Sequence, residues 1–349
     1  MFLLLGSKGY FQLFQELPTT GGRIAITFVI EEKLFLAIGN TLNATGGTHN
    51  IMLQIYRLEQ DIFTLYHTLN SLKISAIEYF TINGVHFLAV ANKKNDTSNR
   101  VDSVVYRWQG ERFEEFQRIA TIGASDILYF HSNEKNFLFV SNRMNSTIRI
   151  YQWKNGNFSD IVYESTMVSY KCDVFNIESF VYIACRQPDK TTSVLRWSGS
   201  KLEHIQKITN IDGKGPPHGF QANGTIFLAI PVIKSTEQDI HSYIYRWNGT
   251  TFIEYQSLPT YSSMAWDSFT TTKGDVLLVV ANFHNDREYC VNSTVYKMAN
   301  NKFSLYQQLP TKGSKFVHAF TYKGKHYVVF VNHYDGNSKI INSTVYIWN

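Results

Sequence analysis

The sequence predicts an all-β fold, a seven-bladed β-propeller made of four-stranded antiparallel blades. The first observation behind this prediction is a strand-rich unit that repeats about every 44 to 52 residues. The second is that each unit holds one continuous apolar run and one strand resembling Tyr-x-Trp, and no segment has helical periodicity of useful length. Each of the seven units opens on a bulky apolar residue: Phe11, Phe63, Phe113, Phe158, Leu202, Phe252 and Phe303.

The continuous apolar runs predict the central strand of each blade. The run FLAVAN at 87–92 shows no polar alternation, which indicates that both faces of the strand are covered, as they are between two neighbouring blades. We expect these central strands at residues 35–40, 87–92, 137–142, 181–186, 227–232, 277–282 and 327–332.

A more polar strand follows each apolar run, as in VVYRW at 104–108. Polar turns such as KNGN at 154–157 come next, and their Gly and Asn tolerate the positive backbone angles of a tight hairpin. The opener then begins the fourth, outermost strand. We expect the third strands at residues 54–57, 104–108, 149–153, 193–197, 243–247, 294–298 and 344–348.

The two ends of the chain predict how the ring closes. The chain begins with a lone outermost strand at 11–17 and ends at Asn349, directly after a third strand. Pairing these strands removes both exposed edges, so we expect a single propeller over 11–349 closed by its N-terminal strand. Residues 1–10 are expected to be a lead-in, a candidate remnant of an upstream segment. The apolar stretch at 1–5 is too short for a signal peptide, so we expect any export signal to lie upstream.

The composition limits the classes of partner. The chain is 44% hydrophobic and 15% aromatic, which is ample material for a core. Its net charge is +5, but Lys and Arg are scattered along the repeats, so no nucleic-acid partner is expected. No apolar run approaches the about 20 residues that span a bilayer, so membrane insertion is not expected.

Glycosylation signals indicate a secreted protein or one on the extracellular face of the cell. Asn-x-Ser/Thr sequons are more frequent than the composition gives by chance, and they fall in expected turns, where a glycan can be accommodated. Most lie in the loop before the third strand. The eight candidate glycosylation sites are Asn43, Asn95, Asn145, Asn157, Asn223, Asn248, Asn292 and Asn342.

Three cysteines are too few for a disulfide scaffold. Cys172 and Cys185 fall on the first two strands of one unit, on either side of a turn, so they could face one another across an antiparallel pair. The sequence leaves open whether they form a disulfide or remain two buried thiols. Cys290 is left without a partner in both cases.

The repeat resembles a known one. The pattern F-x-x-x-Q-x-L-P-T, FLAVAN and S-x-V-Y-R-W, seen at 252–260, 87–92 and 103–108, closely resembles the epitempin (EAR or EPTP) repeat. That repeat builds the propellers of the leucine-rich glioma-inactivated proteins and of the thrombospondin-type laminin G domain and EAR repeat protein. The fourth repeat departs from the pattern, with Arg186 in place of the closing Asn, and the fifth has Pro231 and Val232 there.

The resemblance implies a non-catalytic module for extracellular protein–protein interaction, in cell adhesion or signalling. In one branch of the family the partners are ADAM-family receptors, so an ADAM-like cell-surface protein is the partner class that the resemblance implies. Sialidase-type Asp boxes, kelch and WD signatures and a G-x-S-x-G elbow are all absent, so we expect no enzymatic activity. The alternative is a carbohydrate-binding or carbohydrate-processing propeller.

In five of the seven units a polar residue stands two positions before the Phe that ends the innermost strand, and in the third unit Asp126 stands two positions earlier; the five are Glu78, Asp173, His218, Asp267 and His318. Equivalent positions of innermost strands form a ring around the axis of a propeller. We hypothesise that Glu78, Asp126, Asp173 and Asp267 converge there on a structural calcium ion. The alternative is that they hydrate the mouth of the channel and bind no metal. No other cofactor is expected.

Aromatic residues in the loops of one rim are candidate anchors for a protein partner, because a buried aromatic anchor is a common hot spot. Each can equally be ordinary packing. The candidates are Tyr261, Trp266, Phe283, Tyr289, Phe316 and Tyr334.

Overall fold

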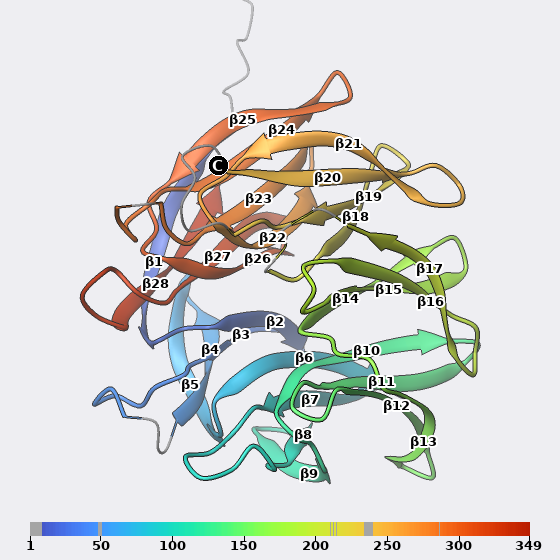
Figure 1. Ribbon diagram of the computed structural model, residues 1–349. Coiled ribbons are helices and arrows are strands. Elements are labelled where there is room, and N and C mark those ends of the chain that lie inside the picture. The colour runs from blue at the N-terminus through green and yellow to red at the C-terminus, as the bar shows by residue number, and fades with distance from the viewer. Residues whose placement is uncertain are drawn as a thin grey trace, which may run out of the picture.

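The computed structural model describes residues 9–47, 51–209, 211, 213, 215–233, 240–285 and 287–349. These residues form seven four-stranded antiparallel sheets arranged in a ring, which confirms the predicted seven-bladed β-propeller (Figure 1). The described ranges contain no helix, and so none that is long and apolar enough to cross a membrane. The expected lead-in lies almost entirely outside the described residues.

Each blade runs from an inner strand at the axis to an outer strand at the circumference. Blade 1 holds β2 (Ile24–Ile30), β3 (Lys33–Gly39), β4 (Ile51–Glu59) and β5 (Ile62–Ser71); blade 2 holds β6 (Ile74–Ile82), β7 (Val85–Asn92), β8 (Ser103–Trp108) and β9 (Phe113–Ile119); blade 3 holds β10 (Ala124–Ser132), β11 (Lys135–Asn142), β12 (Thr147–Lys154) and β13 (Asn157–Ser165). Blade 4 holds β14 (Lys171–Ile177), β15 (Phe180–Arg186), β16 (Thr192–Trp197) and β17 (Leu202–Ile208); blade 5 holds β18 (His218–Ala222), β19 (Thr225–Ile230), β20 (His241–Trp247) and β21 (Phe252–Pro259); blade 6 holds β22 (Ser263–Thr270), β23 (Val276–Asn282), β24 (Ser293–Ala299) and β25 (Lys302–Leu309).

Blade 7 closes the ring with strands from both ends of the chain. It contains β26 (Ser314–Tyr322), β27 (Lys325–Asn332) and β28 (Ile340–Trp348), and its outer strand is β1 (Phe11–Thr20). β1 pairs with β28 from Phe11 opposite Trp348 to Thr20 opposite Ile340. The predicted closure by the N-terminal strand is therefore confirmed. It removes the two edges that an open sheet would expose.

The central strands carry the core, as their continuous apolar runs indicate. Leu36, Leu88, Leu138, Leu228 and Leu278 are completely buried between neighbouring blades. Aromatic side chains also pack from blade to blade near the axis, with Phe80 of β6 stacked on Tyr129 of β10 at 4.5 Å between ring centroids. Such contacts repeat around the ring because each inner strand contacts the inner strand of the next blade, and β26 contacts β2.

The Gln of the F-x-x-x-Q pattern joins adjacent blades. In five places this side chain bonds both the backbone N–H and the backbone C=O of the opener in the next blade. Each such pair satisfies two backbone groups that would otherwise be orphaned at a sheet boundary. The five pairs are Gln15–Phe63, Gln117–Phe158, Gln206–Phe252, Gln256–Phe303 and Gln307–Phe11.

The other positions of the repeat pattern are also used inside the scaffold. Asn92, which closes the FLAVAN run, accepts from the N–H of Leu72 and donates to the C=O of Asp102. Tyr346 of the V-Y pair donates to the C=O of Pro310, the Pro of an L-P-T segment, at 2.7 Å. The residues that define the repeat therefore serve to hold the blades together.

Candidate functional site

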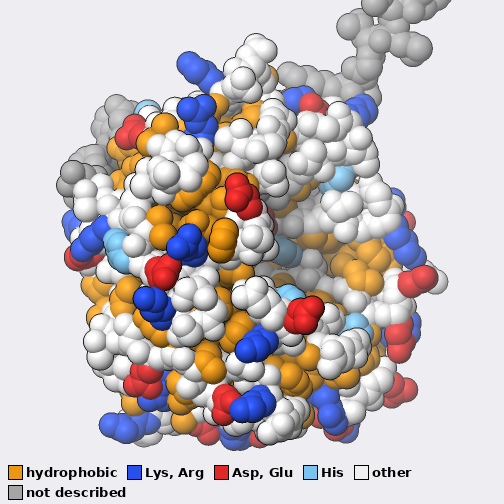
Figure 2. Space-filling model, turned by 90° about the vertical axis from the view of Figure 1, so that its right-hand side faces the viewer, with side chains coloured by type: hydrophobic (Ala, Val, Ile, Leu, Met, Phe, Trp, Pro, Cys, Tyr) orange, Lys and Arg blue, Asp and Glu red, His pale blue; other side chains and the backbone are white. Residues whose placement is uncertain are grey.

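A cavity of about 450 Å³ opens on the axis of the ring. Its wall comes from the starts of the inner strands and the ends of the central strands, which lie at the same end of each antiparallel pair. We call this end of the propeller the first rim and the other end the opposite rim. Figure 2 shows one face of the molecule, hollowed near its middle.

Basic side chains from five consecutive blades gather around this cavity. Two of them, Lys315 of β26 and Arg23 just before β2, occupy equivalent positions at the starts of inner strands. The others stand at or just after the ends of central strands. We call the set the basic arc; in ring order from blade 7 to blade 4 its members are Lys315, Arg23, Lys93, Arg143 and Arg186.

The members of the basic arc perturb one another. Burial, together with the charges of Arg23, Lys339 and Lys93, lowers the pKa of Lys315 to about 7. Burial and neighbouring cations, Arg23 and Arg143 among them, lower the pKa of Lys93 to about 8. Desolvation and like charge both disfavour the protonated amine, so the shifts report a crowded and unneutralised cationic site.

Deeper in the cavity, hydrogen-bond acceptors on five of the inner strands each link their blade to the next one. Each side chain accepts from a backbone N–H of the neighbouring inner strand, which satisfies a donor that faces the channel. These pairs are Glu78 with Tyr129, Asp126 with Cys172, Asp173 with Gly219, Asp267 with Ala319, and His318 with Thr27. The last pair crosses the seam between blades 7 and 1.

We call this set of acceptors the belt. Carboxylates and histidines alternate along one side of the belt. His218 Nδ1 lies 3.7 Å from Asp173 Oδ2, and His218 Nε2 lies 3.8 Å from Asp267 Oδ1. His318 Nδ1 lies 3.3 Å from Asp267 Oδ2. Burial raises the pKa of Asp173 to about 6 against the opposing effect of His218. Burial also tends to raise the pKa of Asp267, but the hydrogen bond with His318 and the charges of both histidines outweigh it and lower the pKa.

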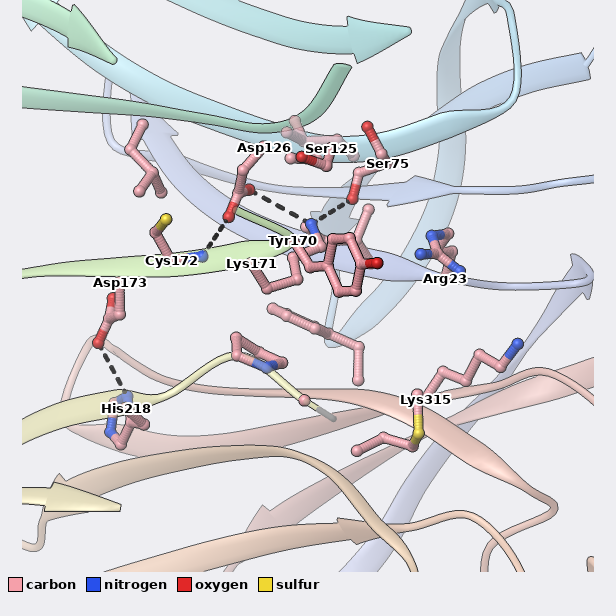
Figure 3. A pocket seen from close by; sticks show the side chains of 18 of the residues that line it. Arg23, Ser75, Ser125, Asp126, Tyr170, Lys171, Cys172, Asp173, His218 and Lys315 are labelled. Carbon is pink, nitrogen blue, oxygen red and sulfur yellow. Dashed lines mark hydrogen bonds and ion pairs between the residues drawn. The ribbon is translucent and has the colours of Figure 1, made fainter. Parts of the chain in front are cut away.

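On the other side of the belt the acids are neutralised in two different ways. Asp126 forms a buried ion pair with Lys171, whose Nζ lies 3.3 Å from Oδ1 and also donates to the C=O of Ser75 (Figure 3). Among the described residues Glu78 has no such partner, and burial raises its pKa to about 8. Glu78 is therefore mostly protonated near neutral pH.

The four acids hypothesised to hold calcium do line the cavity, as expected from their place on the innermost strands. They are not brought together as a ligand set: within the described ranges, no three His, Cys, Asp or Glu side chains form a group suited to a metal ion. Each carboxylate already accepts a backbone N–H, and Asp126 is paired with Lys171. The described residues therefore do not fit the calcium site that the sequence suggested.

The six aromatic candidates lie in four different surroundings. Trp266 does not stand on the rim surface, because it is buried and its indole N–H donates to Ser263. Phe316 lines the cavity, and Tyr261 is an exposed single side chain. The remaining three form a cluster on the first rim, the aromatic cluster, which consists of Phe283, Tyr289 and Tyr334.

The aromatic cluster adjoins the basic arc. Tyr289 packs on Phe283 at 5.3 Å and on Tyr334 at 4.7 Å between ring centroids. Lys315 Nζ lies 5.1 Å from the centroid of Phe283, close enough for a cation–π contact. Sequence reasoning therefore found part of this rim, but it missed the charged part.

Sequence reasoning missed all five members of the basic arc as site residues. One local signal was present: Lys93 and Arg143 each directly follow the Asn that closes an apolar run. Because the two basic residues hold equivalent positions in adjacent repeats, they must lie on the same rim of the ring.

Cys172 and Cys185 form a disulfide between facing positions of β14 and β15, so the open question of their state is answered in this structure. Cys290 is exposed and free. The disulfide stands at the cavity wall, directly after Lys171 in the chain. It fixes the register of the strand pair that carries Lys171 and Arg186.

The sequons lie on both rims of the ring. Six of the asparagines are exposed, whereas Asn43 and Asn157 are half-buried. Asn342 does not lie in a loop as expected: it falls within β28, opposite Pro18, and its Nδ2 donates to Glu16. The exposed asparagines are Asn95, Asn145, Asn223, Asn248, Asn292 and Asn342.

Comparison with solved structures supports the fold only. A chain of the crystal structure of BBS1N in complex with ARL6DN has a TM-score of 0.63 at 12% identity, covering 97% of this chain and 95% of that one. A protein from Lactobacillus plantarum has a TM-score of 0.64 at 14% identity (91% and 92%). The periplasmic gluconolactonase of Pseudomonas aeruginosa has a TM-score of 0.62 at 13% identity (89% and 95%).

Comparison with sequences supports the repeat type. The EPTP domain model matches residues 62–109, 251–297 and 302–349. The thrombospondin-type laminin G domain and EAR repeat-containing protein of Mus musculus is 29% identical over 156 residues, 43% of this chain and 22% of that protein. The Homo sapiens protein of that name is 26% identical over 337 residues, 95% of this chain and 45% of that protein, so this chain spans less than half the length of these relatives. EPTP repeats are thus matched in three of the seven repeats, and the similarity to the EAR repeat-containing protein extends along nearly all of the propeller.

Proposed function

We propose that this propeller is a protein-binding module without catalytic activity, which acts in the secretory pathway or outside the cell, with the first rim as its binding face. The observation that carries the proposal is that the side chains of the repeat pattern and those of the first rim make different contacts. The residues that define the EPTP repeat bond the blades to one another. The aromatic cluster instead stands beside a basic cavity on the first rim, and its aromatic residues do not recur in the other repeats. Tyr, Trp and Arg are the side chains enriched in protein-binding hot spots.

The extracellular location rests on two further features. Six exposed sequons offer attachment sites to oligosaccharyltransferase, and a disulfide such as Cys172–Cys185 persists in oxidising compartments. The partner that we propose is a cell-surface or secreted protein, with an ADAM-like receptor as the class that the family resemblance suggests.

Binding of the tagged, secreted propeller to live cells would test this proposal. Trypsin treatment of the cells should abolish binding, whereas sialidase, heparinase and chondroitinase should leave it unchanged. The reverse result would favour the carbohydrate-binding alternative, and so would a specific hit on a glycan array. Turnover of a bound glycan would contradict the absence of catalysis.

A pair of variants tests the binding face. Tyr289→Ala with Tyr334→Ala should reduce cell binding by about tenfold or more, as expected for loss of hot-spot aromatics. Phe180→Ala is the matched control, because Phe180 is an exposed aromatic residue at the opposite rim. Equal losses from the two changes would contradict the assignment of the first rim.

A further inference from the structure

The basic arc surrounds only part of the cavity mouth. Its members come from blades 7, 1, 2, 3 and 4, which are consecutive around the ring. In Figure 3, Arg23 and Lys315 extend at one end of the pocket, and the Asp173–His218 pair lies at the other end. The cavity is therefore polarised, with cations at its mouth and the belt of acceptors deeper inside.

The charge at the mouth is not balanced from within the described part of the chain. There, Arg23, Lys93, Arg143 and Lys315 form no ion pair with a carboxylate. The carboxylate that acts on Arg23 is Asp126, which already pairs with Lys171. Cations held close together, of which Arg23, Lys93 and Lys315 are half-buried and Arg143 is exposed, are unfavourable without an anion, so the site is built to gain from one.

The wall opposite the basic arc is apolar. It comes from blades 5 and 6, through Pro216, Pro217, Met264 and the buried Trp266. A ligand that fills the mouth must therefore present negative charge on one side and apolar groups on the other. This mixed lining is the feature that separates one class of anion from another.

We propose that the basic arc binds an acidic peptide segment of a protein partner, with carboxylates on the arc and apolar side chains on the wall made by Pro216, Pro217 and Met264. A sulfated glycan carries charge along its whole length and would place sulfates against that apolar wall. Guanidinium groups such as Arg23 and Arg143 can hold a carboxylate by two parallel hydrogen bonds, and Lys93 and Lys315 add point charges. The inference rests on the proposed protein-binding function and specifies the chemistry of its partner.

Peptide binding to the whole propeller tests the inference directly. The probe is a fluorescein-labelled octapeptide of alternating Glu and Leu, compared with a Gln–Leu peptide of equal length and with a heparin-derived tetrasaccharide. Fluorescence anisotropy should show saturable binding of the acidic peptide alone at about 50 mM NaCl, weakened at about 300 mM because salt screens the partly exposed charges. Absence of acidic-peptide binding, or tighter binding of the tetrasaccharide, overturns the proposal.

Matched charge removals locate the site. Arg23→Gln and Lys315→Gln should each weaken peptide binding about tenfold, the expected loss for a charge-assisted hydrogen bond. Lys325→Gln removes the same charge from the start of β27 at the opposite rim and should leave binding within about twofold. If neither Arg23→Gln nor Lys315→Gln weakens peptide binding, the assignment is overturned. Unchanged melting temperatures will show that the variants are folded.

A second measurement uses the unmodified protein. Lys315 has an amine with a pKa of about 7, so acetic anhydride at neutral pH should label it faster than Lys325, whose pKa is raised by its hydrogen bond to Asp61. The acidic peptide should slow labelling of Lys315 but not of Lys325, as read by mass spectrometry. If the peptide does not slow the labelling of Lys315, the inference is contradicted. Trypsin-sensitive cell binding without peptide binding would overturn this inference alone and leave the proposed protein-binding function standing.

Discussion

Gln307 of blade 6 holds Phe11 of β1 by two hydrogen bonds, from the Phe11 N–H to Oε1 and from Nε2 to the Phe11 C=O, each 2.8 Å long. The same pairing occurs between Gln117 and Phe158, where no chain end is involved. Two such pairs involve the strand that closes the ring: Gln307 holds Phe11, and Gln15 of β1 holds Phe63 of blade 1. Ring closure thus depends on the ladder with β28, on Gln307 of blade 6 and on the contact of Gln15 with blade 1.

Gln307→Ala should therefore destabilise the protein by about 2 kcal/mol, the loss of two partly buried hydrogen bonds, and should also free β1 locally. Hydrogen exchange by mass spectrometry should show faster exchange at 11–20. Gln117→Ala is the matched control, because it should cost a similar free energy of unfolding but leave exchange in β1 unchanged. Equal exchange in β1 for both variants would show that Gln307 has no special part in closure.

The fold could be predicted because its determinants recur at fixed positions. Asn92 and Tyr346 each have equivalents in most repeats, so the role of a residue in one repeat can be inferred from its equivalents in the others. The lone strand at 11–17 indicates how the ring closes. The basic arc could not be predicted in this way. Arg23 and Lys315 are isolated in their own repeats, and only the ring brings positions 292 residues apart in sequence to one cavity mouth.

The calcium hypothesis shows the limit of the same reasoning. The repeat alignment correctly placed Glu78, Asp173 and Asp267 on the channel wall. It could not show that the next inner strand presents an N–H to each of them, because that depends on the stagger between blades. The position of a backbone N–H group cannot be inferred from a pattern of side chains.

Glu78→Gln should change how stability depends on pH. The pKa of Glu78 is raised to about 8 in the folded state, above the value of about 4.5 in an unfolded chain. The stability that the protonated carboxyl contributes is therefore complete below pH about 4.5 and is lost as the pH rises through about 8. The neutral amide should thus stabilise the protein relative to wild type increasingly across this range, by on the order of 2 kcal/mol at pH 8 after allowance for partial exposure.

Urea unfolding at several pH values measures this difference. Glu111→Gln is the control, because Glu111 is exposed and should show no such trend. A constant difference between Glu78→Gln and wild type from pH 5 to pH 8 would mean that Glu78 is ionised in the folded protein.

Removal of the disulfide should destabilise blade 4. Cys172 and Cys185 close a short loop with a sequence separation of 13, for which the chain-entropy model gives about 3 kcal/mol as an upper figure. The double variant Cys172→Ala with Cys185→Ala should melt at a lower temperature, and a reductant should lower the melting temperature of wild type only. Cys290→Ser should behave like wild type because Cys290 is exposed and free. Insensitivity of the wild type to reductant would contradict a stabilising disulfide.

Glycan occupancy follows from exposure if the chain passes through the secretory pathway. Asn95 and Asn248 are exposed in tight turns, where their backbone is accessible to the transferase, whereas Asn157 begins β13 and is half-buried. Asn95→Gln and Asn248→Gln should each remove the mass of one glycan from the secreted protein, and Asn157→Gln should remove none. Intact-mass measurement before and after glycosidase treatment decides this. A secreted protein without glycans at Asn95 and Asn248 would deprive the extracellular proposal of its main support.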